Sequence, residues 1–100
     1  MIEITQYKYR VTITGHAGYA EHGHDIVCAG VSTLVQTLIQ SLQKLTMAEI
    51  KYDMQPGKVD IIHGLLLADA RTLMDAFFIG VNMIAEEYPQ HVRVVQAMTT

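Results

Sequence analysis

The fold is set by residues 15–45, which read GHAGYAEHGHDIVCAGVSTLVQTLIQSLQKL. The first ten, Gly15 to His24, include three glycines and lack apolar periodicity, which predicts a loop longer than the usual roughly 4 to 6 residues. From Asp25 onward apolar residues recur at helical spacing, so we expect a helix that Asp25 caps and that ends near Leu45. Its apolar face comprises Val27, Val31, Leu34, Val35, Leu38, Leu42 and Leu45. This helix should belong to the core and carry the loop at its start.

Two hairpins flank this stretch. Residues 2–5 and 9–14 alternate apolar and polar side chains, which predicts two short strands joined by a tight turn. After the helix, residues 50–54 alternate in the same way, residues 55–57 (Gln-Pro-Gly) have turn chemistry, and residues 59–63 return as the partner strand.

The remainder predicts a second helix and a last strand. Asp69 can cap a helix from about Ala70 to Glu87, and His91 to Val95 forms a strand that leaves Gln96 to Thr100 as a frayed tail. The inward stripe of the helix is Ala70, Leu73, Met74, Phe77, Val81, Ile84 and Tyr88. The apolar residues beside that stripe are Phe78, Ile79 and Met83. They make the apolar face wider than one small sheet needs, which suggests a dimer surface.

The order of these elements predicts the fold class. Strands and helices alternate as ββαββαβ, which favours an α+β two-layer sandwich with two helices on one face of a mostly antiparallel sheet. With 100 residues, half of them apolar, the chain has the size of a single domain spanning 1–100.

Composition excludes several classes of function. Lys and Arg total 7 against 10 Asp and Glu, and a net charge of -3 argues against a surface that binds DNA or RNA phosphates. No apolar run approaches the ~20 residues that span a bilayer, and no signal-like segment opens the chain. We therefore expect a cytoplasmic protein that does not bind or span a membrane. A single cysteine, Cys28, cannot form an internal disulfide, so it is either a buried apolar residue or a working thiol.

The position of Cys28 favours chemistry. If Asp25 is the cap, Cys28 lies in the first helical turn, where backbone N–H groups and the helix dipole favour a thiolate. A dipole worth about 0.3 to 1 kcal/mol cannot ionise a thiol at neutral pH, whereas an imidazolium about 4 Å away is worth on the order of 4 kcal/mol. His16 is the best placed partner because it follows a strand and Gly15, while His22 and His24 lie deeper in the loop and should be secondary. A Cys28–His16 dyad could attack a carbonyl, with helix N–H groups receiving the oxyanion.

These residues resemble a known signature. Gly15-His16-Ala17, Tyr19, Gly23 and Asp25-Ile26-Val27-Cys28-Ala29 with Ser32 are similar to the bacterial ribosomal-processing cysteine proteases, the Prp family. The resemblance implies a cofactor-free protease with Cys28 as nucleophile and His16 as general base. It also implies a homodimer with a mobile loop over the site, at about Ala17 to His24.

The implied substrate is the N-terminal extension of a large-subunit ribosomal protein, L twenty-seven, which the family cuts after an aromatic and before a small residue. Two features depart from the pattern: Gly30 replaces a frequent alanine, and the turn Gln6 to Lys8 is unusually short. The acidic residues Glu21 and Asp25 and the negative net charge would attract a basic ribosomal protein.

Two other interpretations stay open. His16, His22, His24 and Cys28 could bind zinc, although their spacing is not that of a common zinc site, so we expect no metal. The chain could instead be a non-catalytic module that binds the ribosomal protein or another partner through its loop and the broad apolar face of the second helix.

The supporting residues also have alternative roles. Asp25 could orient a histidine instead of only capping the helix, and Ser32 could reach the site or bond the carbonyl one turn back. The remaining histidines, His63 and His91, receive no role.

Overall fold

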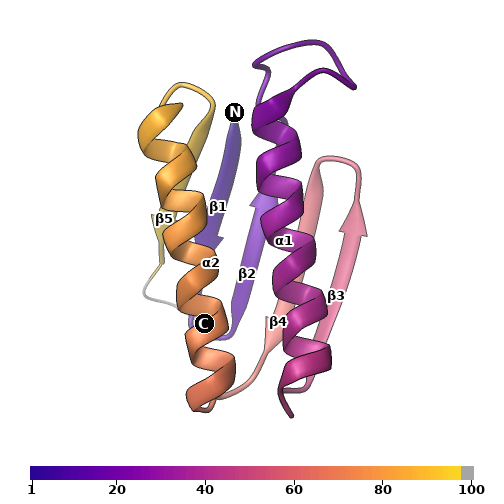
Figure 1. Ribbon diagram of the computed structural model, residues 1–100, viewed down its shortest axis with the longest axis vertical. Helices are drawn as coiled ribbons and strands as arrows, with labels where there is room; N and C mark the ends of the chain where they lie inside the picture. The colour runs from indigo at the N-terminus through magenta and orange to yellow at the C-terminus, as the bar shows by residue number, and fades with distance from the viewer. Residues whose placement is uncertain (98–100) are drawn as a thin grey trace.

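A computed structural model, which describes residues 1–97, has the seven elements in the predicted order (Figure 1). They are β1 (Ile2–Gln6), β2 (Arg10–Thr14), α1 (Ile26–Leu45), β3 (Ile50–Gln55), β4 (Lys58–His63), α2 (Ala68–Glu87) and β5 (Val92–Gln96). The predicted α+β class is confirmed, with one five-stranded sheet and two long helices.

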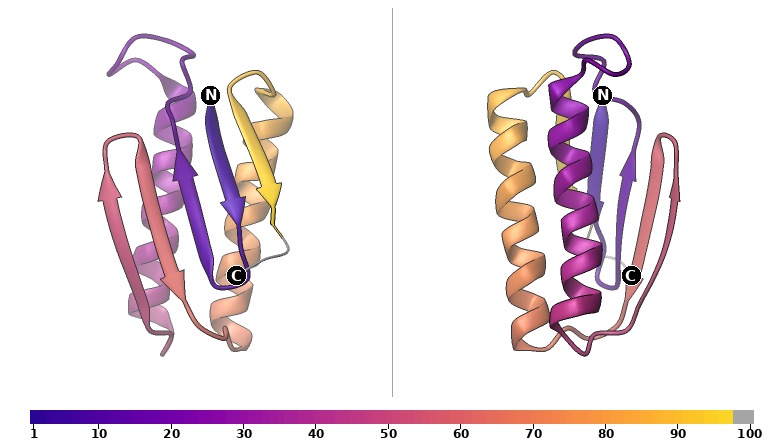
Figure 2. Two further views of the ribbon diagram at one scale, coloured as in Figure 1. Left: turned by 180° about the vertical axis from the view of Figure 1, so that it is seen from behind. Right: turned by 45° about the vertical axis from the view of Figure 1, so that its right-hand side comes forward.

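The strands lie in the order β3-β4-β2-β1-β5. The pairs β3–β4, β4–β2 and β2–β1 are antiparallel, and β1–β5 is parallel. Each helix therefore crosses over between two parallel strands, from β2 to β3 or from β4 to β5. The two crossovers run in opposite directions from oppositely oriented strands, so the right-handed rule brings both helices to the same face. Figure 2 shows both helices on that face, while the other face carries none.

The core lies between the sheet and the two helices. Fully buried residues come from every layer and include Ile4, Val11, Leu42, Ile61 and Val81. The predicted stripe of α1 is largely correct, but Leu45 is 69% exposed and Ile39 is buried. The reason is that α1 packs on α2 as well as on the sheet, so its buried face is wider than a single stripe, and Leu45 is the last residue of the helix.

Small residues let the helices approach each other. A Cβ added at Gly30 would lie 3.3 Å from Ile84 Cδ1, and one at Gly80 would lie 3.0 Å from Leu34 Cδ1. Gly30, which is unusual in the signature, thus lies where α1 packs closely against α2.

The second helix corrects one expectation. It begins at Ala68, after Leu67, and no side chain caps it; the carboxylate of Asp69 accepts instead from the adjacent Ala70 N–H at 2.7 Å. Phe78 is buried, whereas Ile79 and Met83 are each 64% exposed. The expected homodimer through this surface stays a prediction.

The end of the described chain corrects the expectation of a frayed tail. Gln96 belongs to β5, and the Ala97 N–H donates to the Gln6 carbonyl at 2.8 Å, so the predicted frayed tail does not begin at Gln96. The rest of that predicted tail, 98–100, lies outside the described residues.

Helix α1 also has the length and apolar composition of a membrane-spanning helix, contrary to the expectation that no segment reaches that length. Core helices pass the same test, and the buried side of α1 faces the sheet and α2. The length of α1 alone is therefore weak support for a membrane span.

Candidate active site

The loop between β2 and α1 starts at a glycine that no other residue could replace. Gly15 has φ +90°, and a Cβ there would lie 2.2 Å from the Met1 carbonyl oxygen. Its N–H donates to the Gly57 carbonyl at 2.9 Å, which joins the loop to the β3–β4 turn. His16 therefore leaves the sheet at a fixed point, with its carbonyl accepting from the N-terminal amine.

Asp25 joins the end of this loop to the helix. One carboxylate oxygen accepts from the N–H groups of Val27 and Cys28, each at 3.0 Å, which confirms the predicted cap. The other accepts from Tyr19 at 3.0 Å and Ala20 at 3.4 Å. These backbone donors, that of Cys28 above all, hold the pKa of the Asp25 carboxyl below its usual 3.8. One ionised side chain thus serves both the helix start and the loop.

Cys28 is half-buried in the first turn of α1. Its Sγ accepts a hydrogen bond from the Ala17 N–H at 3.2 Å. Ala17 is only 2% exposed, so this donor comes from a packed part of the loop. The arrangement places an amide dipole against the sulfur, where it favours negative charge.

The expected oxyanion donors need correction. The N–H groups of Val27 and Cys28 are bound by the Asp25 carboxylate, and the Ala29 N–H donates to the Asp25 carbonyl at 3.0 Å. A donor already paired in this way is not free for a substrate oxygen. The N–H group that faces the sulfur is that of Ala17, near the start of the loop.

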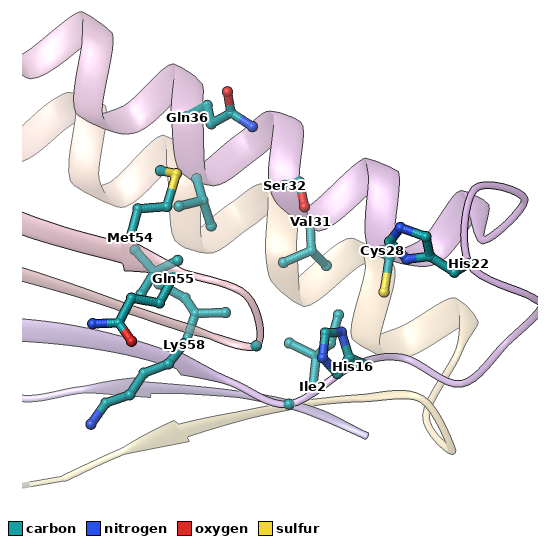
Figure 3. A pocket seen from close by; sticks show the side chains of 15 residues that line it. Ile2, His16, His22, Cys28, Val31, Ser32, Gln36, Met54, Gln55 and Lys58 are labelled. Atoms are coloured by element: carbon teal, nitrogen blue, oxygen red, sulfur yellow. The ribbon is translucent and has the colours of Figure 1, made fainter.

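His16 and Cys28 line the same cavity, of about 220 Å³, between α1 and the β3–β4 hairpin. Figure 3 shows the Cys28 sulfur pointing from α1 toward the His16 ring. The His22 side chain, on the loop, lies beside Cys28. No hydrogen bond joins the ring to the sulfur. Gly57 packs against the ring, since a Cβ there would lie 3.0 Å from His16 Nε2.

The cavity is mostly apolar away from the sulfur. Ser32, one turn after Cys28, lies at its rim. The apolar part of the wall consists of Ile2, Ile13, Val31, Val35, Met54 and Val59. A second hollow, of about 410 Å³, lies on the loop side of Cys28 and is lined by Gly18, Ala20, Gly23 and Asp25 among others. The sulfur therefore lies where two hollows meet.

The remaining loop residues are exposed. His24 lines neither hollow, and its N–H donates to the Glu21 carbonyl at 2.9 Å. The Tyr19 ring meets Tyr88 and His91 edge-on, with centroids 5.3 and 5.4 Å away. Within residues 1–97 no three His, Cys, Asp or Glu side chains come together to hold a metal ion, so the zinc interpretation gains no support.

Sequence reasoning missed two contributors. The turn residue Gly57 was recognised only as turn chemistry, and His91 received no role although its Nδ1 lies 2.9 Å from the Ala17 carbonyl oxygen. The turn signal could have suggested a contact at Gly57. No local pattern could indicate a contact between residues 74 positions apart.

Comparisons with known proteins show the family of this chain. Residues 1–93 match the family model described as Cysteine protease Prp. The chain is 32% identical over 87 residues to a ribosomal processing cysteine protease Prp of Staphylococcus aureus, covering 84% of this chain and 82% of that protein. A Mycoplasma pneumoniae protein of the same name is 46% identical over 35 residues, 35% of each chain.

Solved structures agree as well. A crystal structure of the Staphylococcus aureus ribosomal processing protease Prp, in complex with a covalently linked product peptide, matches with a TM-score of 0.87 at 25% identity. The match covers 96% of this chain and 97% of that one. A structure from Streptococcus mutans matches with a TM-score of 0.70 at 32% identity, over 99% of this chain and 93% of that one.

Proposed function

Because this chain belongs to the Prp family of cysteine proteases, we propose that it removes the N-terminal extension of the large-subunit ribosomal protein L twenty-seven, with Cys28 as nucleophile and His16 as general base. The observation that carries the assignment of roles is the shared cavity, into which both side chains project from opposite walls (Figure 3).

The two residues support a two-step acyl transfer. His16 accepts the Cys28 proton, and the thiolate attacks the scissile carbonyl carbon to form a tetrahedral intermediate. Collapse breaks the C–N bond, and the His16 imidazolium protonates the leaving amine. Water, deprotonated by His16, then attacks the thioester, releasing the carboxylate product and restoring the thiol. Hydrogen bonds of this kind often close only when substrate binds, so an open His16–Cys28 pair is compatible with the role.

Backbone anchoring favours His16 over His22 as the base. His16 lies two residues after the end of β2, the intervening Gly15 is bonded to the β3–β4 turn, and the His16 ring packs against Gly57. His22 lines the same cavity and is exposed like His16, but it lies in the middle of the loop, away from any strand. A general base needs a defined position relative to the nucleophile, which only the first arrangement provides.

The two hollows beside Cys28 support the expected cleavage preference. The cavity toward β3 and β4 offers an apolar wall for an aromatic side chain before the scissile bond. The hollow on the loop side is lined by small residues together with His16, His22 and Asp25, and the charge of the Asp25 carboxylate suits basic residues after the scissile bond. A Staphylococcus aureus relative has also been crystallised in complex with a substrate peptide.

The test is cleavage of a peptide that spans the extension, with an aromatic-alanine step, followed by mass spectrometry. Cys28→Ala should abolish cleavage, and His16→Ala should lower kcat by roughly 10²- to 10⁴-fold, as loss of a general base does. His22→Ala is the matched control and should stay within about tenfold of the unaltered protein. Undiminished cleavage by Cys28→Ala would remove the nucleophile assignment, and an equal loss in the two histidine variants would remove the preference for His16.

Labelling separates the protease from a non-catalytic binding module. A working thiol should be alkylated by iodoacetamide quickly at neutral pH, and His16→Ala should slow that reaction. A merely structural thiol would react slowly in both proteins.

A further inference from the structure

His91 lies in the turn between α2 and β5 and reaches across to the active-site loop. Its Nδ1 is 2.9 Å from the Ala17 carbonyl oxygen. Because a carbonyl can only accept, Nδ1 carries the proton in this contact. The backbone of His91 is also fixed, since its N–H donates to the Tyr88 carbonyl and its carbonyl accepts from the Ile2 N–H, both at 2.9 Å. The ring thus extends from a point tied to both α2 and β1.

Ala17 is the residue through which this contact can act on the sulfur. Its N–H faces Cys28 Sγ at 3.2 Å and its carbonyl is held by His91. The next residue, Gly18, has φ +67° and is exposed, so the chain turns outward directly after Ala17. If the hydrogen bond from His91 were lost, the peptide group between Ala17 and Gly18 would be free to rotate.

We propose that His91 is a positioning residue for proteolysis, which holds the Ala17 carbonyl and so fixes the Ala17 N–H against the Cys28 sulfur. The inference rests on the proposed role of Cys28 as nucleophile. A preorganised N–H stabilises negative charge on the sulfur without reorganising during the reaction. The Tyr19 ring packs edge-on against the His91 ring, with the ring centroids 5.4 Å apart.

His63 provides a matched control. Its Nδ1 lies 2.8 Å from a backbone carbonyl oxygen, that of Gly64, and its ring meets Tyr9 edge-on at 6.5 Å. It is at the end of β4, and it lines neither hollow beside Cys28. His63→Leu therefore removes the same kind of bond without touching the site.

The experiment measures iodoacetamide alkylation of Cys28 and peptide cleavage in four variants. His91→Leu should slow alkylation and lower kcat on the order of tenfold, the loss of about one hydrogen bond, with KM unchanged. His91→Asn should stay within about twofold of the unaltered protein, because the asparagine amide nitrogen lies as many bonds from the backbone as Nδ1. His91→Gln, whose amide lies one bond further out, should behave like His91→Leu. His63→Leu should change neither rate.

Two results would overturn the proposal. One is alkylation and kcat at the unaltered rates in His91→Leu. The other is equal loss in the asparagine and glutamine variants, which would assign His91 a merely structural role. Should His91→Leu not fold, as judged by circular dichroism, the asparagine and glutamine pair still decides. If the unaltered protein is alkylated rapidly but cleaves no peptide, the proposed substrate fails while the alkylation series still tests His91.

Discussion

The two helices have the same length, 20 residues each, but their starts differ. They run side by side in opposite directions, so α1 begins at the end of the sheet that holds the site and α2 begins at the other end (Figure 1). Asp25 gives α1 a side-chain cap and also accepts two hydrogen bonds from the loop. Leu67, at the start of α2, is 71% exposed and offers no side-chain acceptor.

The difference shows that helix stability does not require the cap. Helix α2 forms without one because its first turns bury Ala70 and Met74, and packing supplies most of the stability of a helix in a folded protein. At the start of α1, in contrast, the carboxylate holds the loop that carries Ala17 beside Cys28. We infer that the polar side chain is placed where the site needs it.

Among the changes that test this comparison of the two helix starts, the largest effect should come from Asp25→Ala. It removes the helix cap and the bonds to Tyr19 and Ala20 together, so the loop and the first turn both lose their anchor. We expect kcat/KM for the peptide to fall on the order of 100-fold, since small displacements of reacting groups cost that much. The melting temperature should fall by roughly 4 to 8 °C. Asp69→Ala, at the start of α2, is the control and should leave kcat/KM unchanged.

Asp25→Asn should separate the two roles. An asparagine oxygen caps a helix about as well as aspartate, but its amide nitrogen cannot accept from the Tyr19 N–H. We expect the melting temperature to stay close to that of the unaltered protein, while kcat/KM falls on the order of tenfold. If the asparagine variant keeps full activity, the loop bonds do not matter to catalysis.

The contrast also shows how far sequence reasoning reaches. The Asp25 cap and the place of Cys28 in the first turn were predictable because capping depends on residues two and three positions apart. The same rule misplaced the cap of α2 at Asp69 and its start at about Ala70, because an exposed leucine gave no sign that the helix begins earlier. The oxyanion donors were misassigned because the pattern could not show that the Asp25 side chain already occupies them. The parallel β1–β5 pair and the His91–Ala17 contact join distant parts of the chain and leave no local trace.

A smaller effect should appear in the pH dependence of stability. The pKa of Asp25 is lowered in the folded protein, chiefly by the Cys28 N–H, so its ionised form is favoured by folding. Its contribution is fully present above the unfolded value of about 3.8 and is lost as the pH falls through the lower folded value. The melting-temperature gap between the unaltered protein and Asp25→Ala should therefore be constant from pH 7 to 5 and should narrow as the pH falls below about 3.8. A gap that closes between pH 7 and 5 would contradict this assignment.

The smallest effect should come from giving α2 the cap that it lacks. Leu67 has the extended backbone of an N-cap, φ -82° and ψ 175°, so Leu67→Ser can place a hydroxyl oxygen near the first-turn N–H groups, of which that of Ala70 already donates to the Asp69 carboxylate. We expect the melting temperature to rise by roughly 4 °C, because a cap adds up to about 1 kcal/mol and an exposed leucine loses little packing. Leu65→Ser, at a residue 82% exposed in the same connection, adds no cap and should give no rise. Peptide cleavage should be unchanged in both variants, since α2 begins at the opposite end of the sheet from the start of α1 (Figure 1). An equal rise in the two variants would mean that removing an exposed apolar side chain, and not capping, stabilises this end of the fold.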